Sequence, residues 1–359
     1  MSAVGAVDLE DADGLIAADR DGLLRAASMA GAQVRSVAAA LSEGELDSLR
    51  GEDRVRSVIW VAGRGAAETA GALLAATLAT AAAEPIALVT EAPPWVGPLD
   101  VLIVAGDDPG DPALVGAAAT GVRRGSRVVV VAPFEGPLRD STAGRVAVLS
   151  PRLPAPEEFG LCRYLAAGLA VLQTIDSRLS IDLAALADEL DAEALRNSAS
   201  RDLFTNPAKT LAARMTDCQV ALAGDNAATL ALARHGSSVL LRVAQQAAAA
   251  AGLGDAVAAL RNGPRGFADP ADALFHDEEI DGPLPQRLRV LALTLAAERT
   301  VVAARVAGFD DVYLIGAEDM QDAPDQPTVP TAAARAEQQL AVLAVRLEMA
   351  AVYLRLARG

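Results

Sequence analysis

The chain has 359 residues, of which 52 % are hydrophobic and only 3 % aromatic, and its formal net charge is −16. A length of this order predicts about two domains, and the apolar content is ample for two buried cores. The acidic balance argues against nucleic acid and against anionic membranes as partners, because it would repel their phosphates.

The two cysteines and the N-terminus bear on the compartment. Cys162 and Cys218 lie far apart and form no CxxC pattern, which is typical of small buried thiols in a reducing cytosol. The N-terminal segment is acidic and has no apolar core, so we expect no signal peptide. The longest apolar stretch, residues 70–83, is shorter than the ~20 residues that a membrane span needs. The sequence therefore predicts a cytoplasmic protein.

The first half of the chain alternates between two kinds of segment. Two amphipathic stretches, residues 11–29 and 34–49, predict N-terminal helices. Short, continuous apolar runs then alternate with Ala-rich helical segments. Continuous apolarity indicates burial on both faces, as in a parallel sheet flanked by helices. The predicted strands are residues 57–62, 85–90, 100–106, 127–133 and 146–150.

The second half repeats this rhythm more weakly. A charged helical connector, residues 176–206, separates the halves, and a long terminal helix is expected over residues 331–358 with leucines on one stripe. The predicted strands are residues 219–224, 237–241, 289–295 and 312–316. The domain prediction is an N-terminal helical segment (1–50), a first domain (51–176), a connector (177–206) and a second domain (207–359).

The most informative stretch follows the first predicted strand, where Gly63, Arg64 and Gly65 lead into a small-residue helix. Backbone N–H groups at such a helix start can bind an anion. One interpretation is a dinucleotide-binding loop with Glu91 on a ribose, but Glu68 stands where the third glycine belongs.

A second interpretation comes from motif order along residues 57–357. A glycine-rich loop at 63–71 is followed by a loop at 105–112, by Pro156 and Glu157 before a helix, and by the sequence Asn-Pro-Ala-Lys at 206–209. This order resembles the sugar-isomerase (SIS) family, in particular the bifunctional glucose-6-phosphate/mannose-6-phosphate isomerases and the divergent high-GC bacterial branch called TobH proteins. The resemblance implies two tandem SIS domains, each a doubly wound parallel sheet flanked by helices, with N-terminal helices and a long C-terminal helix.

The resemblance also implies a site for a sugar phosphate or sugar derivative, and a homodimer. The catalytic candidates are His276 at the position of a ring-opening histidine, Glu279 near it, and Glu157 where the family has an arginine. The segment that would carry the base, residues 240–250, contains no acid. The proposed ligand-binding residues are Gly63, Arg64, Gly65, Thr69, Gly106, Asp107, Asp108 and Arg242.

Each candidate also has a purely structural interpretation. Asp107 and Asp108 can simply precede a helix that Asp111 caps, and Glu157 can complement a helix dipole. His276 can be a surface residue among acids, and a metal site there would have only one nitrogen ligand. We expect no metal and no cofactor.

Two functions follow from these residues. The first is a carbohydrate-derivative-binding or regulatory SIS protein with a degenerate active site, because hydroxyl donors are replaced by Ala66, Ala67 and carboxylates. The alternative is a divergent phosphosugar aldose–ketose isomerase, in which Arg64 and Arg242 supply the anion contact.

Overall fold

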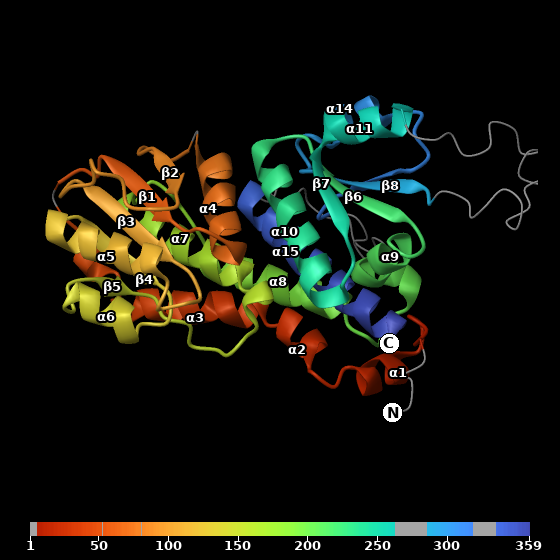
Figure 1. Cartoon of the computed structure of the whole chain (residues 1–359), viewed down its shortest axis with the longest axis horizontal. Coiled ribbons are helices and arrows are strands. Elements are labelled where there is room, and N and C mark those ends of the chain that lie inside the picture. The colour runs from red at the N-terminus through yellow and green to blue at the C-terminus, as the bar shows by residue number, and fades with distance from the viewer. Residues whose placement is uncertain (1–5, 52, 80, 263–285, 319–334) are drawn as a thin grey trace, which may run out of the picture.

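Two parallel sheets form the frame of the molecule, with a layer of helices between them (Figure 1). The computed structural model describes residues 6–51, 53–79, 81–262, 286–318 and 335–359. The first sheet has the order β2-β1-β3-β4-β5, and the second has the order β7-β6-β8-β9. The fold class expected from the sequence is therefore confirmed.

The first sheet contains β1 (Ser57–Val61), β2 (Ile86–Val89), β3 (Asp100–Ala105), β4 (Arg127–Val131) and β5 (Ala147–Val148), all parallel. Its two faces bury alternate residues of β1, β3 and β4. Val58 and Trp60 face the middle of the molecule, whereas Ile59 and Val61 face an outer cluster. Residues on both faces of these strands are buried, which explains why the strands are continuously apolar and do not alternate with polar residues.

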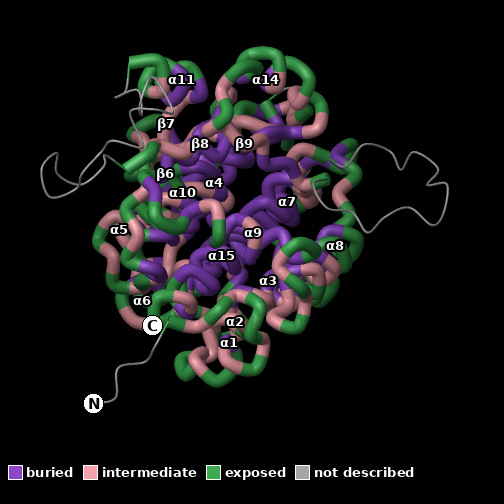
Figure 2. Tube along the Cα trace, turned by 90° about the vertical axis from the view of Figure 1, so that its right-hand side faces the viewer, coloured by how far each residue is buried: buried purple, intermediate pink, exposed green. Residues whose placement is uncertain are grey.

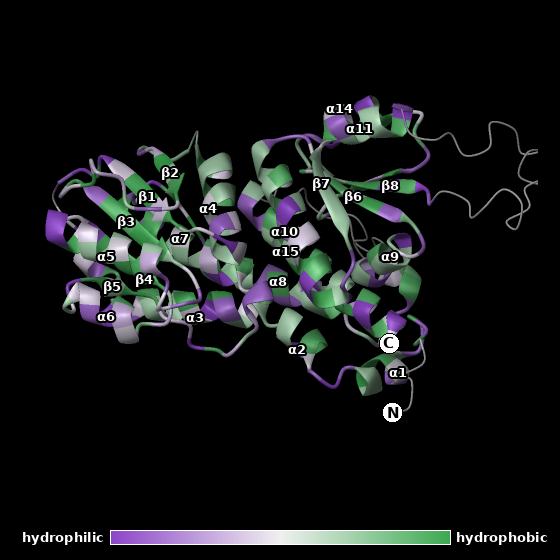
Figure 3. Cartoon of the chain, viewed as in Figure 1, coloured by the Kyte–Doolittle hydropathy of each residue, from purple (hydrophilic) through white to green (hydrophobic). Residues whose placement is uncertain are grey.

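Helices cover both faces of this sheet. On the inner face lie α3 (Ala30–Ser42), α4 (Gly65–Leu78) and α7 (Leu161–Ile175), while α5 (Pro112–Arg124) and α6 (Gly136–Thr142) cover the outer face. Figure 3 shows mostly apolar colour along the strands and a mixed, more polar surface on α6. The 3-10 turns η1 (Asp47–Leu49) and η2 (Glu157–Phe159) precede β1 and α7, respectively.

The second sheet contains β6 (Gln219–Gly224), β7 (Ala248–Gly252), β8 (Leu288–Leu293) and β9 (Val312–Ile315), again all parallel. Helices α9 (Pro207–Arg214), α10 (Ala227–Ala244) and α15 (Ala336–Arg358) pack on its inner face. Helices α11 (Leu253–Asn262) and α14 (Arg299–Val306) pack on its outer face. Helix α8 (Leu183–Arg196) and η3 (Leu203–Thr205) form the connection between the halves.

One predicted strand is wrong. Residues 237–241 lie in the middle of α10, and the strand of this region is the alanine-rich β7. A short apolar run does not by itself distinguish a strand from a buried helix segment. Here Asn226 caps the helix start, its side chain accepting from the backbone N–H of Thr229 at 2.8 Å, and the helix continues for 18 residues.

The N-terminal helix expected over residues 11–29 is broken in two. The structure has α1 (Ala12–Ala18), which ends at the C-cap Asp19, and α2 (Leu23–Ala27), which starts after Gly22 in the left-handed conformation with a φ of +67°. Both lie beneath α15 near the C-terminus (Figure 1).

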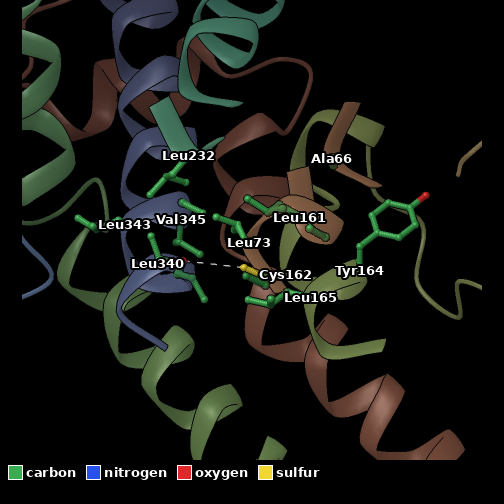
Figure 4. Close-up of a cluster of buried hydrophobic side chains, with 14 of the residues drawn as sticks. Ala66, Leu73, Leu161, Cys162, Tyr164, Leu165, Leu232, Leu340, Leu343 and Val345 are labelled. Atoms are coloured by element: carbon green, nitrogen blue, oxygen red, sulfur yellow. Dashed lines mark hydrogen bonds between the residues drawn. The ribbon is translucent and has the colours of Figure 1, made fainter. Parts of the chain in front are cut away.

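The inner helices of both halves share one apolar core. Figure 4 shows side chains from α4, α7, α10 and α15 in a single cluster, in which the Cys162 thiol donates to the carbonyl of Ala341 at 3.9 Å. Figure 2 shows the same concentration of buried residues along α7 and α15. The long C-terminal helix is confirmed, but it is enclosed on nearly all sides rather than along one stripe. It therefore packs both halves together.

The Asn-Pro-Ala-Lys segment starts α9. The Asn206 side chain accepts from the backbone N–H of Lys209 at 2.9 Å, and Pro207 is the first helical residue. The Lys209 ammonium donates to the carbonyls of Ala199 and Arg201 at 2.8 and 2.9 Å. The only lysine therefore ties the connector to the second half.

Within the described ranges, none of the helices combines the length and the apolarity that crossing a membrane requires.

Candidate functional site

A cavity of about 470 Å³ opens at the carboxyl ends of β1 and β3. These strands are neighbours, but their connections run to opposite faces of the sheet, β1 through α4 and β3 through α5. Such a switch point leaves a crevice in which open α/β sheets bind ligands. The cavity is lined by Gly63, Arg64, Gly65, Ala66, Ala105, Gly106, Asp107, Asp108, Asp111, Leu114, Glu157, Ser238 and Arg242. We call it the first cavity.

The glycine loop leaves this crevice open. Gly65 begins α4 with a φ of +65°, and a Cβ at Gly63 or Gly65 would meet no atom within 4 Å. Among the described residues, no side chain caps the start of α4, so none of them covers its first backbone N–H groups as a capping group. Glu68 lies in this first turn, where its carboxylate opposes the anion that the turn would otherwise favour.

Asp107 is held by the start of α7. The Tyr164 hydroxyl donates to its carboxylate at 2.7 Å, and the Arg163 guanidinium donates to the same oxygen at 3.0 Å. Burial raises the pKa of the Asp107 carboxyl above its ordinary range, although the Tyr164 hydrogen bond and the Arg163 charge act against this. Asp107 is thus a partly desolvated acid in the wall of the first cavity.

Asp111 takes the structural role that the sequence allowed for this loop. Its side chain accepts from the backbone N–H of Ala113 at 2.9 Å and caps α5, whose first residue is Pro112. Asp108 accepts from the backbone N–H of Gly110 at 2.8 Å, which stabilises the turn before that helix. Asp107 takes part in neither of these two hydrogen bonds.

Both cations of the first cavity already have carboxylate partners. Arg242, which comes from α10 in the second half, forms ion pairs with Glu157 and, at 2.8 Å, with Glu158. Arg64 lies 3.7 Å from Asp108. The structure therefore brings Arg64, Asp107, Asp108, Glu157 and Arg242 to one cavity, with both arginines paired to carboxylates.

No family model matches the sequence, and no curated protein matches it. Tagatose-6-phosphate ketose/aldose isomerase from Escherichia coli is similar in structure, with a TM-score of 0.61 at 15 % identity over 94 % of this chain and 91 % of that one. The C-terminal domain of glucosamine-fructose-6-phosphate aminotransferase from Francisella tularensis has a TM-score of 0.57 at 12 % identity over 100 % and 98 %.

A glucose-6-phosphate isomerase like protein from Thermus thermophilus is also similar, with a TM-score of 0.52 at 18 % identity over 98 % of this chain and 96 % of that one. The chain has the SIS fold. These neighbours match both halves of the chain and its terminal helix, because the coverage is nearly complete. The tandem SIS architecture expected from the motif order is confirmed.

Thr69 lies beside the first cavity rather than in it. It lines a smaller hollow of about 170 Å³ that shares Gly65, Glu157 and Arg242 with the first cavity. Its hydroxyl donates to the carbonyl of Gly65 at 3.2 Å, so this hydrogen bond lies within α4.

His235 lines the same small hollow. It is 4 % exposed and lies 2.9 Å from the Glu348 carboxylate of α15. Burial raises the pKa of the Glu348 carboxyl, although the bond to His235 opposes that rise. The His235–Glu348 pair therefore links α10 to α15 inside the shared core, next to the first cavity.

His276 and Glu279 lie outside the described residues, so their place relative to the first cavity remains a prediction. Across the described ranges, no group of three His, Cys, Asp or Glu side chains is placed to hold a metal ion.

Arg163 and Tyr164 are site residues that sequence reasoning missed. A signal was present, because Arg163 is the only charged residue in α7, an otherwise apolar helix of 15 residues. A charge in a buried helix requires a partner, and here the partner is Asp107. The sequence did not indicate which acid that would be.

Proposed function

We propose that this SIS-fold chain binds a carbohydrate derivative at the first cavity and does not interconvert aldose and ketose phosphates. In this proposal it belongs to the TobH-like branch that the motif order resembles, and it works in the cytoplasm as a homodimer. Similarity in fold to proteins named as sugar-phosphate isomerases supports a carbohydrate as the bound group.

The observation that carries the proposal is the charge pairing in the first cavity. Two arginines face four carboxylic acids, Asp107, Asp108, Asp111 and Glu157. Two unit charges ~4 Å apart interact by about 4 kcal/mol at an effective dielectric of ~20, less where the groups are exposed. A phosphate dianion would have to displace carboxylates from both arginines and would still face the remaining acids.

Isomerisation also needs a group that stabilises its intermediate, and the charge pairing in the first cavity works against this. Proton transfer between C1 and C2 passes through an enediolate, which a cation or hydrogen-bond donor must stabilise. Glu157 stands where the resemblance places an arginine, and it occupies Arg242. A carboxylate at that position raises the energy of an enediolate instead of lowering it.

The test is a coupled assay of the purified chain on fructose-6-phosphate and mannose-6-phosphate, together with thermal-shift measurements on neutral and phosphorylated sugars. We expect no turnover but a stabilising shift, since a ligand at ~100 times its Kd stabilises by about 2.7 kcal/mol. Turnover that disappears in His276→Ala would overturn the proposal. Light scattering at micromolar concentration tests the homodimer, and a monomer would refute it.

The divergent isomerase remains the second candidate because of Asp107. A partly buried acid with a raised pKa in a cavity wall is a candidate proton acceptor. If the chain does isomerise a sugar phosphate, Asp107→Asn should abolish turnover while leaving the thermal shift in place. Turnover that survives in Asp107→Asn would exclude this role.

A further inference from the structure

A second cavity, of about 480 Å³, lies beneath the proline-rich loop at residues 151–156. Its walls come from α3, from the loop itself and from the start of α7. Asp107 and Glu157 line this cavity as well as the first one. We call it the second cavity. Of the site residues predicted from the sequence, Asp107 and Glu157 alone line it.

Two buried polar atoms of its lining have no hydrogen-bond partner among the described residues. They are Oε1 of Gln33 and Nη1 of Arg163. Gln33 is 2 % exposed and Arg163 is 8 % exposed. Buried polar atoms in folded proteins are nearly always satisfied, so two orphans in the wall of one cavity require an explanation.

Both head groups are fixed by their other atoms. The Gln33 amide nitrogen donates to the carbonyl of Phe159 at 3.1 Å, which assigns Oε1 as the unsatisfied end. The Arg163 guanidinium donates through Nη2 to Asp107 and stacks over the Tyr164 ring at 4.1 Å. Neither side chain can turn away to find water without breaking a bond that it already makes.

We propose that the second cavity is a binding site for a neutral, hydroxyl-bearing ring such as an uncharged sugar. Oε1 of Gln33 is an unsatisfied acceptor and Nη1 of Arg163 is an unsatisfied donor, and hydroxyl groups complement both. Asp107 and Glu157 disfavour an anion, while Arg152 and Arg163 disfavour an ammonium group. Pro151, Pro154 and other apolar residues of the loop provide surface for the C–H faces of a ring. The volume lies in the range of small-molecule sites.

This site goes beyond the proposed function, because it uses a different cavity and different polar groups. It does not depend on the first cavity binding anything. If both sites are occupied, Asp107 and Glu157 form part of the wall of each, so the two bound groups would be neighbours.

The experiment measures binding of D-glucose to the full chain by saturation-transfer NMR and calorimetry. Gln33→Met removes the acceptor at similar side-chain length, and Arg35→Met on the same helix is its control. Arg35 pairs with Asp188 and Asp191 of α8, so it serves a different contact. Arg64→Gln reports on the first cavity. We expect Gln33→Met to weaken glucose binding by about fivefold, the loss of roughly one hydrogen bond, with Arg35→Met within about twofold of the wild type.

Several results would overturn the second site. One is wild-type affinity in Gln33→Met. Another is weakening in Arg64→Gln alone, which would assign glucose to the first cavity and leave the proposed function standing. Absence of binding at about 100 mM glucose would also refute it. If Gln33→Met does not fold, Ala155→Phe fills the same cavity from the loop and should abolish binding. A crystal structure in glucose that shows only ordered water on Gln33 and Arg163 would refute the proposal too.

Discussion

The carboxyl edges of the two sheets differ, although the sheets share one architecture. At the first sheet, Gly63 and Gly65 border open space, and a cavity follows. At the second sheet, the corresponding turn after β6 is packed tightly, since a Cβ at Gly224 would lie 2.3 Å from the backbone nitrogen of Leu230. The same strand–turn–helix unit is therefore open in one half and closed in the other.

Side chains also fill the space around the turn after β6. The Asn226 amide donates to Glu298 at 2.6 Å, and Arg305 pairs with Asp225. After β9, the fully buried Arg346 donates to the carbonyl of Gly316 at 2.7 Å and to Glu193 at 2.7 Å. Arg346 also lines a hollow of about 330 Å³ at the end of β9, so the second half is open there and closed at its glycine turn, whereas the first half is open at its glycine turn. The comparison teaches that capacity for a ligand depends on what fills the crevice, not on the strand order that creates it.

The largest expected effect is a loss of stability when a buried ion pair of the second half is removed. Arg346→Met removes one of the two cations of Glu193, which is 0 % exposed, and leaves Arg196 at 3.0 Å as the other. Removing one partner of a buried ion pair costs about 3–5 kcal/mol, and because Arg196 remains, the free energy of unfolding in urea denaturation should fall by about 3 kcal/mol, the lower end of that range. Arg355→Met is the matched control on the same helix. Its pair with Asp21 is exposed, and the change should be below about 1 kcal/mol. Equal losses of stability in the two variants would contradict this difference between a buried and an exposed ion pair.

The next effect compares the two glycine turns directly. Gly224→Ala forces a methyl group against backbone atoms of Thr229 and Leu230 at 2.3 to 2.4 Å. Overpacking of this kind costs about 1–3 kcal/mol, and backbone contacts favour the upper end. Gly63→Ala points into open space and should change the unfolding free energy by less than about 0.5 kcal/mol. If Gly63→Ala is as destabilising as Gly224→Ala, the first turn is not open.

A third experiment tests whether paired cations keep phosphate out of the open half. Glu157→Gln combined with Glu158→Gln releases Arg242, because both of its carboxylate partners lose their charge. We expect glucose-6-phosphate to bind about tenfold more tightly, which corresponds to ~1.4 kcal/mol. Calorimetry at low ionic strength measures this. Asp188→Asn with Asp191→Asn changes the net charge equally near Arg35 and should leave affinity unchanged. Equal gains would mean that only net charge matters.

The smallest effect concerns the pH dependence of stability in the open half. The pKa of Asp107 is raised by burial, so the folded state binds this proton more tightly than the unfolded state does. Stability contributed by this proton is present below the unfolded pKa and is lost as the pH rises through the folded pKa. The wild type should therefore gain stability relative to Asp107→Asn as the pH is lowered from 7 toward 4. Melting temperatures across that range measure the trend, and a relative loss would mean that Arg163 and Tyr164 outweigh burial.

The sequence by itself determined the features that local chemistry controls. Continuous apolar runs predicted β1, β3 and β4, because burial of both strand faces requires them. Asp111 before Pro112 predicted a helix start, because a capping side chain reaches only the next few backbone N–H groups. Motif order predicted the SIS fold and the glycine loop at the first cavity.

The tertiary structure alone decided which distant side chains meet. Arg242 reaches Glu157 because α10 packs against α4 and η2, which places residues 85 positions apart in contact. Gln33 and Arg163 face one cavity because α3 and α7 pack on the same face of the first sheet. The segment 237–241 became a helix because Asn226 starts α10 and the shared core buries one of its faces. Long-range packing has no fixed spacing in the sequence, so an arginine that looked available for phosphate is found between two carboxylates.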